Sequence, residues 1–263
     1  MHLPAGTLPA LALAAALLGA PAARADTAPS PLATAMRVLD DAFAHGKLDE
    51  ILAARAAFGA LVADAPGSPA NQYGLALADW RAVPLMDSTR AVQARKLCKE
   101  GIAACDRALA AEPSFADALA LRAGLQGIAL AFAPGAAMSL GAEIVEQNAR
   151  ARGMAPANPR VQLLAAISLL HQPEFTGGGP KAAKPAFEKV IALYAAQEGD
   201  TSAIAWGRTD AYAWSGRCLA ALGDWAGARR RYLEVLELRP DHAWTKHVLL
   251  PEAEKHLAAG SGR

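Results

Sequence analysis

One spacing of residues recurs along this chain and constrains its fold more than any other feature of the sequence. Each copy has a small residue, a bulky residue four positions later, an apolar residue three further on and a proline five after that. Steps of four and three keep side chains on one helix face, and proline ends a helix because it lacks the amide hydrogen. The spacing therefore predicts packed helices separated by turns. The fullest copies are Ala54, Phe58, Leu61 and Pro66, and Ala228, Tyr232, Val235 and Pro240; Gly101, Cys105, Ala108 and Pro113 also fit, with cysteine in place of the bulky residue.

Composition favours helices and argues against nucleic acid as a partner. Hydrophobic residues make up 53% of the 263 residues and aromatic residues only 6%, because the excess is mainly alanine. Alanine is the best helix former and a poor strand former. The formal net charge is +1, whereas nucleic-acid binding needs a basic surplus gathered on one face. We therefore expect an all-α protein with no nucleic-acid partner.

The three cysteines are predicted to be buried small residues rather than disulfide or metal ligands. Cys98 and Cys105 are two helical turns apart, which separates them by about 10 Å on a continuous helix. A disulfide requires Cα atoms within about 7 Å. Cys218 is isolated in the sequence, and no spacing typical of a zinc site is present.

The N-terminal segment reads as a secretory signal peptide. Residues 3–23 are almost wholly apolar or small, and Ala23-Arg24-Ala25 forms a small-x-small cleavage site before Asp26. An uncleaved membrane anchor is the alternative, since no Lys or Arg precedes the apolar run, but three prolines interrupt that run. We expect cleavage after Ala25, no membrane insertion afterwards, and a mature protein, residues 26–263, that is periplasmic or secreted.

The mature chain is predicted to form one domain of about five helical hairpins and a C-terminal helix, stacked as an α-α superhelix in which each hairpin packs on its neighbours. The extra length of the second and third hairpins lies around residues 83–91 and 132–141, as lid loops or extended inter-helix turns. A linker, residues 198–208, precedes the last hairpin. The predicted hairpins are 33–66, 67–113, 114–159, 160–197 and 209–242, with a final helix over 242–259.

The last hairpin resembles a tetratricopeptide repeat (TPR). Asp210 is placed to cap its first helix, and residues 222–225, Leu-Gly-Asp-Trp, supply the turn. Ala228 and Tyr232 follow on the second helix, and Pro240 closes it. Asp241 is then placed to cap the final helix, which Pro251 would bend or split. The other hairpins match the repeat less well.

A wider set of residues resembles a group of exported bacterial TPR proteins of uncharacterised function. The likeness covers most of the mature chain and implies architecture and compartment, but no reaction and no ligand. The residues that carry it are Phe175, Gly177, Gly178, Trp206, Gly207 and Arg208.

A glycine-rich turn is the most unusual local feature and a candidate anion site. Backbone amides at glycines, a helix N-terminus and two lysines can together hold a carboxylate or phosphate. The alternative is a turn that needs glycine for positive φ between two helices. Pro185 suggests that the following helix begins nearer Lys184 than Pro180. The candidate anion-binding residues are Gly177, Gly178, Gly179, Lys181 and Lys184.

An aromatic and basic cluster in the last hairpin is the candidate surface for a partner. Aromatic residues and arginine dominate the energetics of protein interfaces. The alternative is core packing between the fourth and fifth hairpins, with the arginine stems covering apolar surface. The candidate residues are Trp206, Arg208, Tyr212, Trp214 and Arg217.

No pattern of catalytic, cofactor-binding or metal-ligating residues is present. The leading hypothesis is therefore a non-enzymatic periplasmic scaffold that binds a protein or peptide on the concave surface lined by the first helix of each hairpin. The alternative is a solute-binding accessory subunit of an envelope transport system, with a small anionic ligand in a pocket of the repeat stack. An enzyme would require convergent titratable side chains with shifted pKa values.

Overall fold

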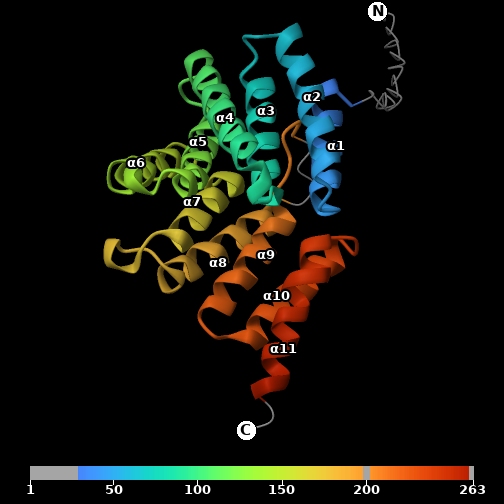
Figure 1. Cartoon of the computed structure of the whole chain (residues 1–263), viewed down its shortest axis with the longest axis vertical. Helices are drawn as coiled ribbons and strands as arrows, with labels where there is room; N and C mark the ends of the chain where they lie inside the picture. The colour runs from blue at the N-terminus through green and yellow to red at the C-terminus, as the bar shows by residue number, and fades with distance from the viewer. Residues whose placement is uncertain (1–28, 198–201, 261–263) are drawn as a thin grey trace, which may run out of the picture.

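A computed structural model describes residues 29–197 and 202–260. The predicted signal peptide, residues 1–25, lies outside them. In the described residues five successive pairs of helices are followed by a C-terminal helix, which confirms the predicted all-α hairpin architecture (Figure 1). The pairs are α1 (Pro31–Ala44) with α2 (Leu48–Asp64), α3 (Pro69–Ala82) with α4 (Ala91–Ala111), α5 (Ala116–Ala129) with α6 (Ala137–Met154), α7 (Pro159–His171) with α8 (Pro180–Ala196), and α9 (Arg208–Ala221) with α10 (Trp225–Leu238). The last helix is α11 (Leu250–Gly260).

Four of the second helices end in the same way, because each is followed by the same kind of residue pair. The residue after the helix has φ between −133° and −146° and ψ between 69° and 88°, and the next residue is proline. A residue before proline is pushed out of the helical region by the proline ring. The third repeat therefore ends at Pro156 rather than at Pro159, where the predicted hairpin ended. Pro159 is the first residue of α7. The four residue pairs are Ala65-Pro66, Glu112-Pro113, Ala155-Pro156 and Arg239-Pro240.

The helices form two layers. The first helices, α1, α3, α5, α7 and α9, contact one another in succession, and each second helix packs mainly against the first helices beside it. The recurring positions form the core: Phe58, Phe187 and Tyr232 are almost completely buried. The large side chain of each second helix therefore fills the space between first helices, as the spacing predicts.

The extended segments in the second and third repeats are compact turns rather than open loops. Residues 83–90 form two short 3-10 helices, η1 (Val83–Leu85) and η2 (Ser88–Arg90). The later segment likewise forms η3 (Leu130–Phe132) and η4 (Pro134–Ala136) before α6 begins. They are extended inter-helix turns, which was one of the two readings of the sequence.

The C-terminal helix starts one residue later than the predicted cap implies. Thr245 donates its amide hydrogen to Nδ1 of His242, so His242 caps this helix and Asp241 does not. Residues Thr245–Leu249 form a π-helical turn before α11. Pro251 follows directly and cannot donate the next helical hydrogen bond, which explains why the helix widens there.

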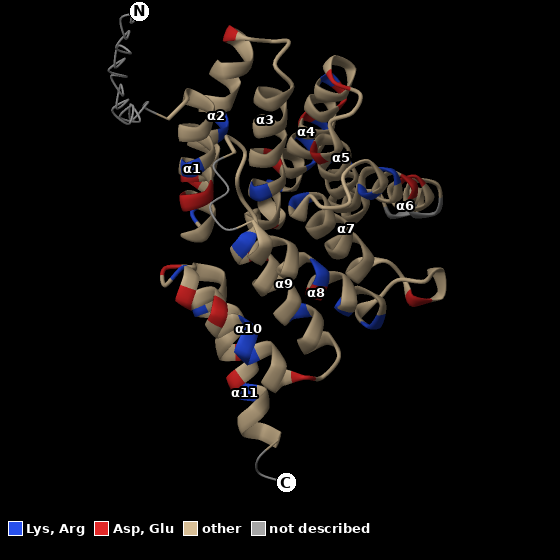
Figure 2. Ribbon diagram, turned by 180° about the vertical axis from the view of Figure 1, so that it is seen from behind, with Lys and Arg blue, Asp and Glu red and all other residues tan. Residues whose placement is uncertain are grey.

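The superhelix closes on itself, since its first and last repeats touch (Figure 2). Arg239, after α10, donates to Asp40 and Asp41 at the end of α1, at 3.1 and 2.6 Å. His45 pairs with Asp241 at 2.9 Å. Figure 2 shows charged residues of both signs where the end of α1 approaches the turn after α10. The first and last repeats therefore meet at one edge of the inner layer.

The three cysteines are buried and none of them forms a disulfide bond, as predicted. Within the ranges 29–197 and 202–260, none of the helices combines the length and hydropathy needed to cross a bilayer.

Candidate functional site

A segment of the chain itself lies against the inner layer of the N-terminal repeats. Residues 202–207 precede α9, and their largest side chain, Trp206, is only 7% exposed. The Trp206 ring packs on Trp80 with a centroid distance of 5.8 Å. Its indole nitrogen donates to the Tyr73 hydroxyl at 2.8 Å. This part of the inner surface is therefore already covered.

The backbone beside Trp206 is fixed by a tyrosine from the preceding repeat. Tyr194 of α8 donates its hydroxyl hydrogen to the Trp206 carbonyl at 2.9 Å. Gly207 follows with φ of +97°, and a Cβ atom there would lie 2.3 Å from the Tyr194 hydroxyl oxygen. Only glycine fits both the left-handed backbone and this close approach. The Trp-Gly pair is thus a packing element of the fold.

Asp210 has a different role from the one predicted, because it does not cap α9. The helix begins at Arg208, with Gly207 before it, so Asp210 already lies in its first turn. Its carboxylate accepts two hydrogen bonds from the Arg81 guanidinium, at 2.5 and 2.8 Å, and both side chains are buried. Arg81 also lies over the rings of Phe43 and Trp206, with its guanidinium carbon 3.8 and 4.9 Å from the two centroids. This cluster joins the second and fifth repeats.

Four side chains form a partly exposed surface on the other half of the inner layer, which we call the aromatic patch: His171, Trp214, Arg217 and Trp244. Trp214 of α9 lies between the other two rings, edge-on to His171 at 5.6 Å and tilted to Trp244 at 5.5 Å. The Arg217 guanidinium lies over the Trp244 ring at 5.9 Å. Both tryptophans are half-buried, whereas His171 and Arg217 are exposed. The patch presents flat apolar faces beside a cation.

The surroundings of His171 favour its neutral imidazole. Although the ring is partly open to solvent, the residues around it shield it enough to lower its pKa below the ordinary value, and the positive charge of Arg217 lowers the pKa further. A neutral imidazole can accept a hydrogen bond or ligate a metal. The patch therefore combines one permanent cation, one neutral imidazole and two indole rings.

The structure separates the five residues of the predicted aromatic cluster. Only Trp214 and Arg217 share the patch. Trp206 points into the core, Arg208 is exposed at the start of α9, and Tyr212 lies beneath the Arg231 guanidinium at 5.8 Å. Core packing thus accounts for Trp206, which was the alternative reading for the cluster.

Sequence reasoning missed two residues of the patch. His171 and Trp244 lie far from Trp214 in sequence, and no local motif links them. Their only sequence signal is their location at helix ends, because His171 ends α7 and Trp244 precedes the π-turn. A long-range prediction of which helix ends meet would be needed to find them.

In the glycine-rich turn the glycine amides already have acceptors. Gly177, Gly178 and Gly179 donate to the carbonyls of Glu174, Pro173 and Leu169. Gly177 and Gly179 have positive φ, of 87° and 89°. This agrees with the alternative interpretation, in which the glycines are needed to form the turn between two helices.

Helix α8 begins at Pro180 and runs through Pro185, so the expected later start near Lys184 is wrong. Lys181 and Lys184 are exposed on its first turns. An anion at this turn would have to be held by these lysines, since the three glycine amides are engaged. The anion site at the turn stays a prediction.

No group of three or more His, Cys, Asp or Glu side chains is arranged to hold a metal ion within the described part of the chain. Among the described residues, pKa values are raised by burial at cysteines, tyrosines and two aspartates, and by acidic partners at arginines. Burial raises the pKa of Asp79 to about 6, for example, although Arg55 opposes this shift. Asp79 of α3 forms an ion pair with Arg55 of α2, which donates a hydrogen bond to its carboxylate.

No protein-family model matches the chain, and no curated protein matches it either. Solved structures with a similar fold include the two that follow. The HusA haemophore from Porphyromonas gingivalis is 26% identical, with a TM-score of 0.60, over 72% of this chain and 91% of that one. A thermophilic TPR protein in Thermus thermophilus is 14% identical, with a TM-score of 0.58, over 86% and 99% of the two chains. With its five packed hairpins, the chain is an all-helical protein with a TPR-like superhelical fold.

Proposed function

We propose that this protein is a non-enzymatic binding module that holds a protein or peptide partner on the aromatic patch. The observation that carries the proposal is the clustering of two half-buried tryptophans and Arg217 on the inner layer. Tryptophan and arginine are the residues that most often dominate binding energy at interfaces, because they bury large areas at low entropic cost. The inner surface around Tyr73 and Trp80 is not open to a partner, since Trp206 covers it.

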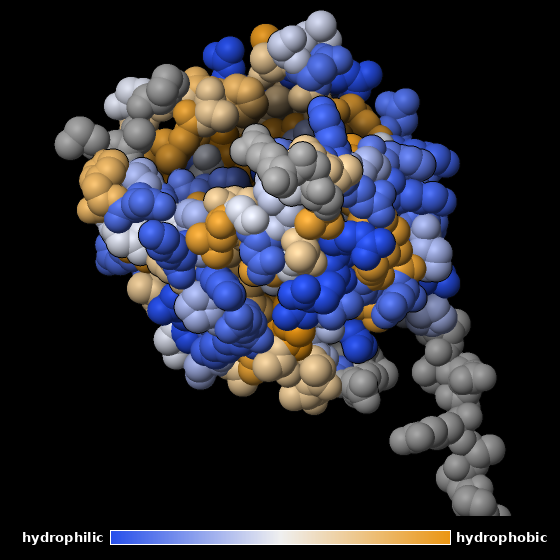
Figure 3. Space-filling model, turned by 90° about the horizontal axis from the view of Figure 1, so that it is seen from below, coloured by the Kyte–Doolittle hydropathy of each residue, from blue (hydrophilic) through white to orange (hydrophobic). Residues whose placement is uncertain are grey.

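The flat indole faces of Trp214 and Trp244 suit a partner with apolar side chains. On the face of the molecule seen from the α11 end, apolar side chains also border a hollow (Figure 3). Exposed arginine on the patch favours a carboxylate in the partner, through a charge-assisted hydrogen bond. An extended or helical segment with an aromatic or aliphatic anchor next to an acidic residue has this chemistry.

A capture experiment with matched variants tests the proposal. The immobilised full chain is incubated with an envelope extract, and the retained proteins are identified by mass spectrometry. We expect one protein that is retained by the unmodified chain and lost on Trp214→Ala and Arg217→Ala. Trp225→Ala is the control, because Trp225 stacks on His256 outside the patch. Equal retention by patch and control variants contradicts the proposal.

Haem is a second candidate ligand, and the similarity to the HusA haemophore favours it. The patch fits the chemistry of a porphyrin. Indole faces can stack on the macrocycle, Arg217 can pair with a propionate, and the neutral imidazole of His171 can ligate iron. In this case the protein would carry haem as cargo.

Absorbance titration with haemin distinguishes the two candidates. A haem carrier should give a saturable Soret shift that is weakened in His171→Ala, whereas His256→Ala should behave as the unmodified chain. His256 lies on α11, stacked on Trp225 and away from the patch. If the haemin spectrum is unchanged by the protein, the haem candidate is wrong and the protein-partner proposal remains.

We also propose that the protein acts outside the cytoplasm, as its N-terminal sequence predicts. The test is to express the full chain in a bacterium with a cell envelope and determine the N-terminus of the protein released by osmotic shock. The proposal predicts a chain beginning at Asp26. Recovery only from the cytoplasm with residues 1–25 intact would contradict it.

A further inference from the structure

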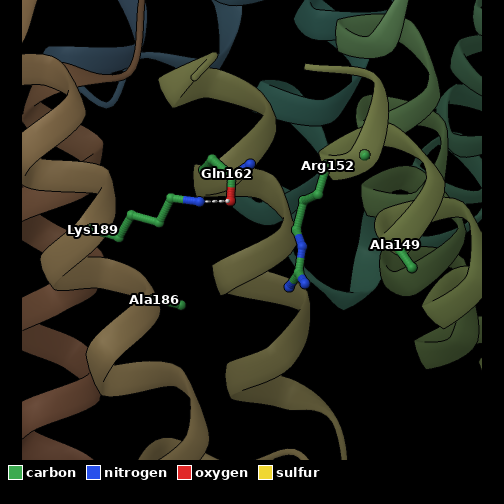
Figure 4. Close-up of a pocket in the computed structure, with 6 residues that line it drawn as sticks. Ala149, Arg152, Gln162, Ala186 and Lys189 are labelled. Carbon is green, nitrogen blue, oxygen red and sulfur yellow. Dashed lines mark hydrogen bonds between the residues drawn. The ribbon is translucent and has the colours of Figure 1, made fainter. Parts of the chain in front are cut away.

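A cavity of about 400 Å³ lies in the outer groove between α6 and α8, above the first turn of α7. Small residues form its walls, and its polar groups are Arg152, Gln162 and Lys189, with no acidic residue among those that line it. Figure 4 shows Arg152 and Lys189 extending toward α7 from opposite sides. The cavity is therefore a space between two cations. The residues lining its walls are Ala149, Gly153 and Ala186.

The first two repeats contain a matched groove, between α2 and α4, that shows what is special here. Gln72 is the fourth residue of α3, as Gln162 is of α7. Arg107 stands two positions after Cys105, as Lys189 stands two after Phe187. In both grooves the cation donates to the glutamine oxygen, at 3.0 Å for Arg107 and 3.5 Å for Lys189. The glutamine–cation pair is thus part of the repeat.

The two grooves differ at one position of the second helix, four residues before the proline that follows it. This position is Val62 in the first repeat and Leu109 in the second repeat, and both side chains pack against the core. The third repeat has Arg152 instead, which is exposed and makes no ion pair or hydrogen bond with the residues that the structure describes. An arginine in the place of a core-packing apolar residue adds the second cation and leaves space beneath it.

The side-chain amide of Gln162 provides a further donor. Gln72 donates its Nε2 hydrogen to the Pro66 carbonyl at 3.1 Å, but Gln162 makes no corresponding bond to a described residue. Gln162 as a whole is only 7% exposed and lines the cavity. Its amide nitrogen is therefore available to an acceptor that comes from outside the chain, next to two cations.

We infer that this groove binds a small oxyanion of two negative charges, a dicarboxylate or a phosphate group. The Arg152 guanidinium and the Lys189 ammonium would neutralise its charge, and the Gln162 amide would donate to one of its oxygens. The small side chains around them leave room for an organic body. This site lies apart from the aromatic patch and does not depend on the proposed function.

Heteronuclear NMR titration of the full chain, with succinate in one arm and inorganic phosphate in the other, tests the inference. We expect saturable amide shifts at residues 149–153 and 186–189. Arg152→Val copies the first repeat at an exposed position, and Lys189→Gln removes the other cation. Each should weaken binding by about tenfold, as the loss of one charge-assisted contact does. Arg107→Gln, in the matched groove, should leave the affinity unchanged.

The two arms and one further variant separate the outcomes. Binding of succinate alone identifies the ligand class as dicarboxylate, and binding of phosphate alone identifies it as a phosphate group. Absence of saturable binding in both arms overturns the inference. So does equal affinity of Arg152→Val and the unmodified chain when their circular dichroism and thermal unfolding agree. Loss of binding in the Lys181→Ala, Lys184→Ala variant instead would place the anion at the glycine-rich turn.

Discussion

The Arg81 guanidinium donates two hydrogen bonds to the carboxylate of Asp210, which lies 129 residues further along the chain, and both side chains are buried. This pair connects α3 directly to α9, two helices of the inner layer that are separated in sequence by the third and fourth repeats. Arg81 also lies over the ring of Trp206. The pair therefore holds residues 202–207 against the second repeat as well as joining the two helices.

Replacing Asp210 with asparagine should strongly destabilise the protein. Asparagine keeps the size of the side chain but leaves the Arg81 charge buried without its partner, which costs about 3–5 kcal/mol. Urea unfolding measures the loss. The double variant Arg81→Met, Asp210→Leu removes both charges and should recover part of it, and a double variant less stable than Asp210→Asn would contradict this explanation.

Trp206→Ala should also destabilise the fold, by about 3–5 kcal/mol, because it removes a large buried ring and leaves a cavity beside Trp80. Trp206→Phe should lose less, since it keeps a ring but not the hydrogen bond to Tyr73. Thermal unfolding monitored by circular dichroism checks both. A Trp206→Ala variant of unchanged stability would show that residues 202–207 are not packed as described.

Stability should fall as the pH falls below about 6.5, through His242. Burial lowers the pKa of His242 below its ordinary value of 6.5, since a charged imidazole is disfavoured there; Asp210 opposes this shift, and Arg81 adds to it. Between the folded pKa and 6.5 the unfolded chain binds more protons, so folding free energy is lost as the pH drops through this window. His242 also needs a neutral Nδ1 to accept the Thr245 amide.

Urea unfolding between neutral and mildly acidic pH measures this dependence. His242→Asn keeps a capping acceptor that does not titrate, so its stability should vary less with pH in this range. Burial also lowers the pKa of His171, so part of the dependence should remain. His256→Asn, at an exposed position on α11, is the control. An unchanged slope in His242→Asn would contradict the assignment.

The contact between the first and last repeats should depend on salt. Arg239 is 22% exposed and pairs with Asp40 and Asp41, and partly exposed pairs are screened by ions. Arg239→Glu places four acidic groups together, since Asp241 also pairs with Arg239, and should increase the maximum dimension measured by small-angle X-ray scattering. Asp64→Lys, an exposed charge change at the end of α2, is the control. Identical scattering curves would show that these pairs do not hold the ends together.

The repeat spacing predicted the helices because it depends only on interactions between residues close in sequence. Steps of four and three fix which face is buried, and a proline fixes where a helix ends. The predicted capping roles of Asp210 and Asp241 were wrong, because both carboxylates bind residues far away in sequence. Asp210 binds Arg81 and Asp241 binds His45. Local propensity could not reveal that competition.

The candidate sites were harder to predict, since they depend on how the superhelix closes. Trp206 and Trp214 look equivalent in the sequence, as aromatic residues near basic ones. One is buried by residues of the second repeat and the other is left on the surface, and only the packing of α3 against the linker decides this. Arg152, by contrast, carries a readable signal, because Val62 and Leu109 occupy its position in the preceding repeats.

Site-specific photo-crosslinking tests the central claim, that a partner binds the aromatic patch, most directly. A photoreactive amino acid is placed at Ala221, exposed on α9 one helical turn after Arg217, or at Arg230, exposed on α10, and each full-length protein is irradiated in an envelope extract. This choice leaves the four residues of the patch unchanged. The account predicts a discrete crosslinked protein from position 221 that is absent from position 230. The same protein crosslinked equally from both positions, or from position 230 alone, would contradict it.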